Sequence, residues 1–126
     1  MIPIPNKSNN PGFQMSVTER TTTAMSYTKV KDIKVSRSGY YICEFALKGS
    51  TDSEFVTGYA RIYKNGVALG TERVVHYTSY VIYYEKLFFE AGSYAQLYCK
   101  SDGTQNPTIK DFSISYCDTE MVVVTD

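Results

Sequence analysis

Short β-prone runs separated by turn residues fill this chain from residue 16 to residue 117, and few folds other than a layered β-sheet protein accommodate that pattern. The clearest turn is Asn65-Gly66, because Asn-Gly is the strongest short hairpin signal and both central residues of such a turn need positive φ. No helical periodicity runs long enough to compete. The sequence therefore predicts an all-β, antiparallel β-sandwich of about eight strands, near residues 16–22, 27–35, 40–48, 55–64, 67–75, 79–89, 93–100 and 107–117.

Alternation along these runs predicts which side chains enter the core, because successive residues of a strand point to opposite faces. The expected inward sets are Tyr41, Cys43, Phe45 and Leu47; Ala60 and Ile62; Ala95, Leu97 and Cys99; and Phe112, Ile114 and Tyr116. The run 79–89 differs because it is apolar on both faces. We therefore expect a second surface to cover it.

The two ends of the chain differ in composition from the sandwich domain, which we place at residues 16–117. Residues 1–15 hold Pro3, Pro5 and Pro11, and proline suits an extended arm better than a helix or an inner strand. The tail 118–126 contains the β-prone run 121–124, which we expect to pair with its own sheet or with another chain. Two polar loops, 49–54 and 101–107, are expected at one end of the sandwich.

Charge and hydropathy exclude some partners. Lys and Arg total 13 and Asp and Glu total 13, with no basic cluster, so the sequence argues against nucleic acid as a partner. No apolar run approaches the length of a membrane span, and residues 1–15 lack the features of a secretory signal, so we expect synthesis in a cytoplasm. Cys43, Cys99 and Cys117 have no zinc-type spacing; we expect buried free thiols, with a Cys99–Cys117 disulfide as the alternative.

Candidate catalytic groups are few, and we expect no enzyme activity, no cofactor and no metal centre. His76 is the one histidine and has no nucleophile motif beside it, while the carboxylates occur singly. In the loop 101–107, Asp102, Gln105 and Asn106 are ligand candidates, since calcium prefers oxygen ligands; the alternative interpretation is an ordinary solvated turn.

Tyrosine is the main functional signal, with 12 Tyr and no Trp in the chain. The candidate binding residues are the outward stripe Tyr59, Arg61 and Tyr63, the group Tyr80, Tyr83 and Tyr84, and Tyr98. Phenol rings and arginine are common at protein interfaces, and the rings also stack on sugars. Three interpretations stay open: a subunit interface, a glycan contact, or ordinary packing within the domain.

Residues 27–41, 60–73, 89–100 and 109–116 carry the motifs SGYY, YKNG, AGSYAQLY and FSISY in that order. This order resembles the C1q/TNF-like jelly roll, and in particular small β-sandwich proteins encoded by phages and prophages of Gram-positive bacteria, over about residues 20–117. The resemblance implies a jelly roll, homotrimers formed through aromatic-rich faces, and a place in the virion as a tail, fibre or head-decoration component. Two departures matter, because this sequence has neither a collagen-like stalk nor a fibre shaft.

Three functional hypotheses follow. The first is a non-enzymatic phage virion protein that forms a homotrimer, contacts other virion proteins and touches the host surface. The alternative is a carbohydrate-binding module that recognises a bacterial cell-surface glycan through Tyr59, Tyr63 and the loops. A small hydrolase is the third, and no motif favours it.

Overall fold

The computed structural model describes residues 12–117, and this part of the chain is built from strands and contains no helix. No helix that is long and apolar enough to span a membrane therefore occurs within 12–117. The strands are β1 (Phe13–Ser16), β2 (Arg20–Thr21), β3 (Thr28–Lys34), β4 (Gly39–Lys48), β5 (Gly58–Lys64), β6 (Val67–Ala68), β7 (Arg73–Val75), β8 (Val81–Phe89), β9 (Tyr94–Lys100) and β10 (Thr108–Cys117).

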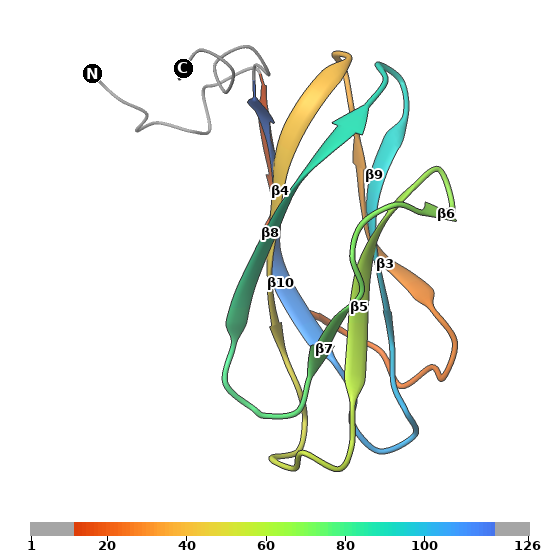
Figure 1. The fold of residues 1–126 in the computed structure, drawn as a ribbon, viewed down its shortest axis with the longest axis vertical. Helices are drawn as coiled ribbons and strands as arrows, with labels where there is room; N and C mark the ends of the chain where they lie inside the picture. Colours follow the sequence, from red (N-terminus) through yellow and green to blue (C-terminus); the bar gives the residue numbers. More distant parts are fainter. Residues whose placement is uncertain (1–11, 118–126) are drawn as a thin grey trace, which may run out of the picture.

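Two antiparallel sheets pack face to face (Figure 1). Sheet A has the order β1-β10-β4-β8, with β2 also on β10, and sheet B has the order β3-β9-β5-β6, with β7 also on β5. Apart from β6 and β7, which follow β5 in its own sheet, the strands from β3 to β10 alternate between the two sheets. This strand order is that of a jelly roll, so the predicted all-β sandwich is confirmed.

The hairpin at Asn65-Gly66 is confirmed. Asn65 has φ 52° and Gly66 has φ 82°, and the turn joins β5 directly to β6. Two predicted strands are each divided in the structure. The strand expected at 16–22 is β1 and β2, so that β1 begins inside the expected arm, and the strand expected at 67–75 is β6 and β7.

The core lies between the sheets and contains the inward sets that alternation predicts. Tyr41, Cys43, Phe45 and Leu47 are buried, as are the other predicted inward residues except Tyr116, which is half-buried. In β10 the register shifts between Lys110 and Ser113, where Asp111 has φ 56°, and the shift turns Phe112 into the core.

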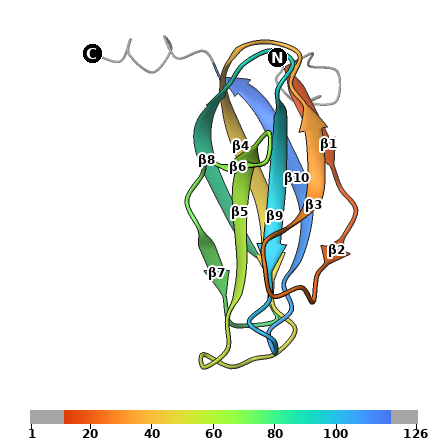
Figure 2. The ribbon, with the colours of Figure 1, turned by 90° about the vertical axis from the view of Figure 1, so that its right-hand side faces the viewer.

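The two ends of the sandwich differ. The loops β2–β3, β4–β5, β7–β8 and β9–β10 gather at one end, which we call the loop end (Figures 1 and 2). At the opposite end, the Tyr116 N–H donates to the Gly12 carbonyl at 2.8 Å, so the described chain starts and finishes there. Most of the expected arm 1–15 and all of the tail 118–126 lie outside the described residues.

The three cysteines are free. Cys99 is in sheet B and Cys117 is in sheet A, so the alternative of a Cys99–Cys117 disulfide between neighbouring strands is wrong. Burial raises the pKa of the Cys43 thiol to about 12, and burial also raises the pKa of Cys99. Both thiols belong to the packed core.

Candidate functional site

The predicted tyrosine stripe lies on the outer face of sheet B, where β5 and β9 bring its members together. Tyr63 stacks on Tyr98 with ring centroids 3.8 Å apart and an interplanar angle of 9°. Tyr27, which the sequence interpretation did not include, lies 5.8 Å from Tyr63 in a tilted arrangement. The Lys100 ammonium lies 4.7 Å from the ring centre of Tyr59 and 4.9 Å from that of Tyr27.

These contacts use the ring faces within the domain. The Tyr63 and Tyr98 rings are stacked nearly parallel, so each ring has one face against the other. The Tyr27 hydroxyl donates to Glu72 at 2.5 Å, and burial together with this bond raises the pKa of Tyr27. The cluster therefore fastens the end of the β2–β3 loop, β5, β9 and the β6–β7 loop to one another.

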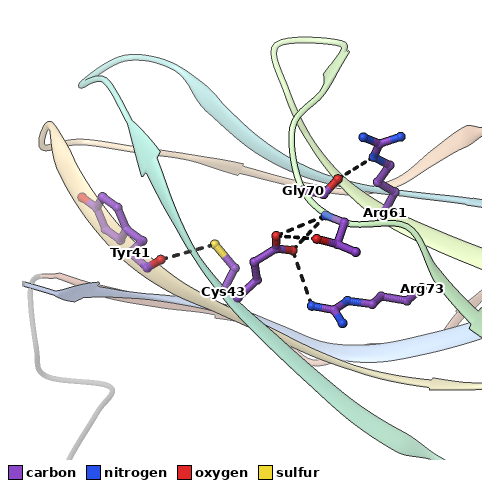
Figure 3. A network of polar contacts seen from close by, with 7 residues as sticks. Tyr41, Cys43, Arg61, Gly70 and Arg73 are labelled. Atoms are coloured by element: carbon purple, nitrogen blue, oxygen red, sulfur yellow. Dashed lines mark hydrogen bonds and ion pairs between the residues drawn. The ribbon is translucent and has the colours of Figure 1, made fainter.

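Arg61 belongs to the same face but serves the β6–β7 loop. Its Nε donates to the Gly70 carbonyl at 2.6 Å (Figure 3). On the inner side of this loop, Glu85 of β8 accepts hydrogen bonds from the N–H and hydroxyl of Thr71 and lies 3.7 Å from Arg73 Nη2. These bonds link sheet B to the edge of sheet A, so Arg61 is occupied by a structural contact.

The other predicted group, Tyr80, Tyr83 and Tyr84, is not one cluster. Tyr83 points toward the core, 5.9 Å from Phe45, and its hydroxyl donates to the Val74 carbonyl. Tyr80 donates to Glu19 at 2.5 Å, and its ring lies beneath the ammonium groups of Lys48 and Lys110. Tyr84 points outward and is 66% exposed, on the face opposite to Tyr83, as the alternation of the strand predicts.

The outer face of sheet A exposes several large apolar side chains. We define it by the outward residues of the paired strands: Phe13 and Met15 on β1, Ser113 and Ser115 on β10, Tyr40, Ile42 and Glu44 on β4, and Ile82, Tyr84, Lys86 and Phe88 on β8. The two serines separate the apolar residues of β1 from those of β4 and β8. Ile82 is 57% exposed, and Met15, Tyr40 and Phe88 are also exposed. The sequence predicted a covering surface over this strand, and within 12–117 no segment covers its outer side.

The apolar groups of the outer face of sheet A are only partly engaged with one another. Phe88 meets Tyr40 edge to face at 5.2 Å, and the Lys86 ammonium lies 5.4 Å from the Tyr40 ring centre. Among the described residues, Tyr84 has no ring contact or side-chain hydrogen bond. The face therefore combines apolar area with one acid and one base, a composition suited to protein contact.

The loop end is organised by Gln105, a predicted ligand candidate. Its buried amide accepts from the N–H groups of Ser50 and Thr51 and donates to the carbonyls of Thr51 and His76. The approach is so close that a Cβ at Gly49 would lie 2.3 Å from Gln105 Oε1. Both polar atoms of this amide make hydrogen bonds within the domain, and these bonds hold the loops together.

The other two loop candidates also have local roles. Asp102 accepts hydrogen bonds from the N–H groups of Thr57, Thr104 and Gln105, and these bonds lower the pKa of its carboxyl. The Asn106 N–H donates to Ser50. Within 12–117, no group of three or more potential metal-binding side chains comes together.

Two exposed aromatic residues at the loop end were missed by the sequence interpretation. Phe55 is 86% exposed and Tyr77 is 51% exposed. Their loops are joined, since Gly49 N–H donates to the Tyr77 carbonyl and Ser53 N–H to the His76 carbonyl. Two hydrogen-bonded loops thus present two rings at the end opposite Gly12 and Tyr116. The described part of the chain has no ligand-sized pocket.

The chain matches no protein-family model and no curated protein sequence. Among solved structures, it is similar to the C-terminal CBM6 of LamC, a marine laminarinase from Zobellia galactanivorans. The identity is 15%, the TM-score is 0.49, and the match covers 86% of this chain and 94% of the other. A similarity of this degree assigns neither a family nor a function.

Proposed function

We propose that the protein is a non-catalytic structural component that binds copies of itself through the outer face of sheet A and forms a closed homotrimer. The observation that carries the proposal is β8, whose outer side exposes Ile82, Tyr84 and Phe88. An apolar strand that is exposed within one copy gains free energy when a partner removes it from water.

The occupant that fits this face is a second copy of the chain. Glu44 and Lys86 lie on adjacent strands of the same face, so two copies can place acid against base. The formal charge of the whole chain is zero, so copies approach without net repulsion. Closed cyclic symmetry leaves no face of this kind unpaired, and the trimer is the closed form that the resemblance implies.

The position of the oligomer in a phage particle is the finer part of the proposal. The resemblance that the motifs from SGYY to FSISY carry is the support for a virion component, made in the bacterial cytoplasm and bound to other virion proteins. A trimer built on sheet A would carry its three loop ends away from the end of the sandwich that holds Gly12 and Cys117. This polarity suits a component that is attached at one end and presents loops at the other.

Light scattering at micromolar concentration tests the assembly. We expect a trimer for the parent protein and a shift to monomer for Tyr84→Glu and Ile82→Glu, because each places a charge in an apolar contact. Phe55→Ser is the matched control, since it removes an even more exposed ring from the loop end and leaves the trimer intact. A monodisperse monomer for the parent protein would overturn the proposal.

A second candidate is glycan binding at the loop end. The observation in its favour is the exposure of Phe55 and Tyr77 on loops that Gln105 holds in place, because exposed ring faces stack on sugars. On a bacterial glycan array, Phe55→Ala and Tyr77→Ala should abolish the hits, while Tyr59→Ala and Tyr63→Ala should keep them. Silence of the parent protein across wall polysaccharides would remove this candidate.

A further inference from the structure

The chain contains two dipeptides that are prone to cyclic imide formation, Asn65-Gly66 and Asp102-Gly103. In this reaction the backbone nitrogen of the second residue attacks the side-chain carbonyl carbon of the first, and glycine favours the attack because it carries no side chain that would hinder it. The other four asparagines precede lysine, asparagine or proline, and a proline nitrogen has no proton to lose. Asn65 is therefore the asparagine at which the sequence most favours this reaction.

At Asn65 the reaction releases the side-chain amide nitrogen. The Gly66 nitrogen forms a bond to Asn65 Cγ, the bond from Cγ to Nδ2 breaks, and Nδ2 leaves as ammonia with the proton of the Gly66 N–H. Water then opens the imide at either carbonyl, which gives aspartate or isoaspartate at position 65. The ring closure has two requirements: the Gly66 nitrogen must be free to lose its proton, and the Asn65 side chain must be free to turn onto that nitrogen.

Solvent reaches the turn that holds these two residues. Asn65 and Gly66 are both exposed, and a Cβ built on Gly66 would have no neighbour within 4 Å. Water and hydroxide therefore have access to the reacting atoms. Any protection of Asn65 has to come from the hydrogen bonds of the turn rather than from burial.

The Gly66 nitrogen is bound by Gln96 of β9. The Gly66 N–H donates to Gln96 Oε1 at 2.7 Å, and Gln96 is buried although it lies on the outer side of sheet B. Gln96 Nε2 donates to Asp32 Oδ1 at 3.1 Å, which orients the amide with its oxygen toward Gly66. Loss of the Gly66 proton would leave a nitrogen lone pair facing the lone pairs of this oxygen, so the bond disfavours the attacking form of the nitrogen.

The Asn65 side chain is bound at the start of β9. Asn65 Oδ1 accepts from the Tyr94 N–H at 2.9 Å, and the Asn65 N–H donates to the Tyr94 carbonyl at 3.2 Å. Closing the imide ring requires the Asn65 side chain to turn away from the Tyr94 N–H. The bonds to Gln96 and Tyr94 therefore oppose the two requirements of the reaction separately.

Asp102-Gly103 provides a comparison within the same chain. The Gly103 N–H donates to Ser101 Oγ at 2.9 Å, so this glycine nitrogen is also bound by a side-chain oxygen. The Asp102 carboxyl accepts three backbone N–H bonds, which lower its pKa and keep it ionised. A carboxylate is a poor target for a nitrogen nucleophile, whereas the neutral amide of Asn65 has no charge to protect it and depends on hydrogen bonds.

We propose that Asn65 is a latent deamidation site and that Gln96 keeps it intact by binding the Gly66 N–H. Deamidation would place a negative charge in the turn between β5 and β6, and isoaspartate would also add one atom to the backbone there. The added atom disturbs the register of Tyr63 with Ala68 and of Lys64 with Val67. This inference is independent of the proposed self-assembly, because every contact that carries it lies within one copy.

Hydrogen exchange tests the bond to Gln96, because base-catalysed exchange removes the same Gly66 proton. In the parent protein we expect Gly66 to exchange more slowly than in the urea-unfolded chain by more than about tenfold, and Gln96→Leu should lose most of this protection. The Leu69 N–H, which donates to the Ile62 carbonyl at 3.0 Å, is the reference within the hairpin and should stay protected. A Gly66 N–H that exchanges at the unfolded rate in the parent protein overturns the proposal.

Incubation in mildly alkaline buffer, followed by peptide mapping, measures the reaction itself. We expect aspartate and isoaspartate at position 65 to accumulate in Gln96→Leu faster than in the parent by more than about fivefold, as the loss of one hydrogen bond implies. Tyr83→Ala is the control, because it destabilises the core beside Phe45 and leaves the turn unchanged. An equal increase in Tyr83→Ala would assign the effect to general destabilisation and overturn the role of Gln96.

A second variant tests the same bond without removing a buried side chain. Asp32 is exposed, and Asp32→Ala frees the Gln96 amide to turn its oxygen away from Gly66. Both Gly66 exchange and deamidation at Asn65 should become faster, though less than in Gln96→Leu. Rates at the parent value in Asp32→Ala and in every folded Gln96 variant would overturn the proposal.

Discussion

Tyr83 and Tyr84 are consecutive residues of β8, yet one ring lies 5.9 Å from Phe45 in the core and the other is 66% exposed on the outer face of sheet A. The same amino acid therefore serves folding at one position and is available for assembly at the next. Because successive side chains of a strand alternate, no rearrangement short of breaking β8 exchanges the two roles.

We expect substitutions at the two tyrosines to have different effects on the free energy of unfolding. Tyr83→Ala should lower the free energy of unfolding by about 2 kcal/mol, because it leaves a gap beside Phe45 and removes the bond to the Val74 carbonyl. Tyr84→Ala should change it by less than about 0.5 kcal/mol in the isolated copy. Urea denaturation at a concentration where the oligomer is dissociated measures both, and equal effects would contradict the assignment of faces.

The loop end should depend on Gln105 more than on any exposed residue. Gln105→Leu keeps the apolar part of the side chain but removes the acceptor of the Ser50 and Thr51 N–H groups. This change should lower the free energy of unfolding by about 3 kcal/mol. The neighbouring change Asn106→Ala is the matched control, because the bond of Asn106 to Ser50 uses its backbone N–H. A Gln105→Leu protein as stable as the control would show that the amide is not the organiser of these loops.

Much of this architecture was predictable from the sequence, because it follows from local rules. Strand alternation correctly predicted that Ala60 and Ile62 lie in the core. The Asn65-Gly66 pair correctly predicted a hairpin, because both residues tolerate the positive φ that the turn requires. The division of the strand expected at 67–75 was not predictable, since Gly70 and Thr71 leave the sheet to bind Arg61 and Glu85. Arg61 lies nine residues before Gly70, and Glu85 lies fourteen residues after Thr71 in the other sheet, so both contacts depend on the tertiary structure.

The candidate site was less predictable for the same reason. The stacking of Tyr63 on Tyr98 depends on the register of β5 against β9, which the sequence does not state. Gln105 sits in a polar loop that looks solvated, and its burial depends on the absence of a side chain at Gly49. The exposure of Phe55 has no local signal, because an aromatic residue at the start of an expected strand ordinarily packs inward.

The acid limb of the stability curve should contain a contribution from Asp102. Three backbone N–H groups hold the pKa of this carboxyl below its ordinary value. The folded state therefore gains stability from Asp102 above the unfolded pKa of about 3.9, and this gain is lost as pH falls through the lower folded pKa. Asp102→Ala should be less stable than the parent at neutral pH and should converge with it in strong acid.

Thermal midpoints measured across that range test the Asp102 contribution. Glu54→Ala is the control, because Glu54 is an exposed acid at the same loop end and makes no hydrogen bond or ion pair among the described residues. A gap between parent and Asp102→Ala that stays constant as pH falls would argue that the loss is steric rather than electrostatic.

The rates at which the three thiols react with a thiol reagent should depend on burial in the core and on the proposed subunit interface. Burial raises the pKa of Cys43 to about 12, so almost no thiolate forms at pH 8, and Cys99 is equally enclosed. Cys117 is only half-buried and lies beside Tyr40 on the outer face of sheet A. With a thiol reagent at pH 8, the Tyr84→Glu monomer should show one fast thiol, which Cys117→Ser removes, and two that react only on unfolding. In the trimer the fast thiol should slow down, because the partner covers the same face; an equally fast Cys117 in both states would place the subunit contact elsewhere.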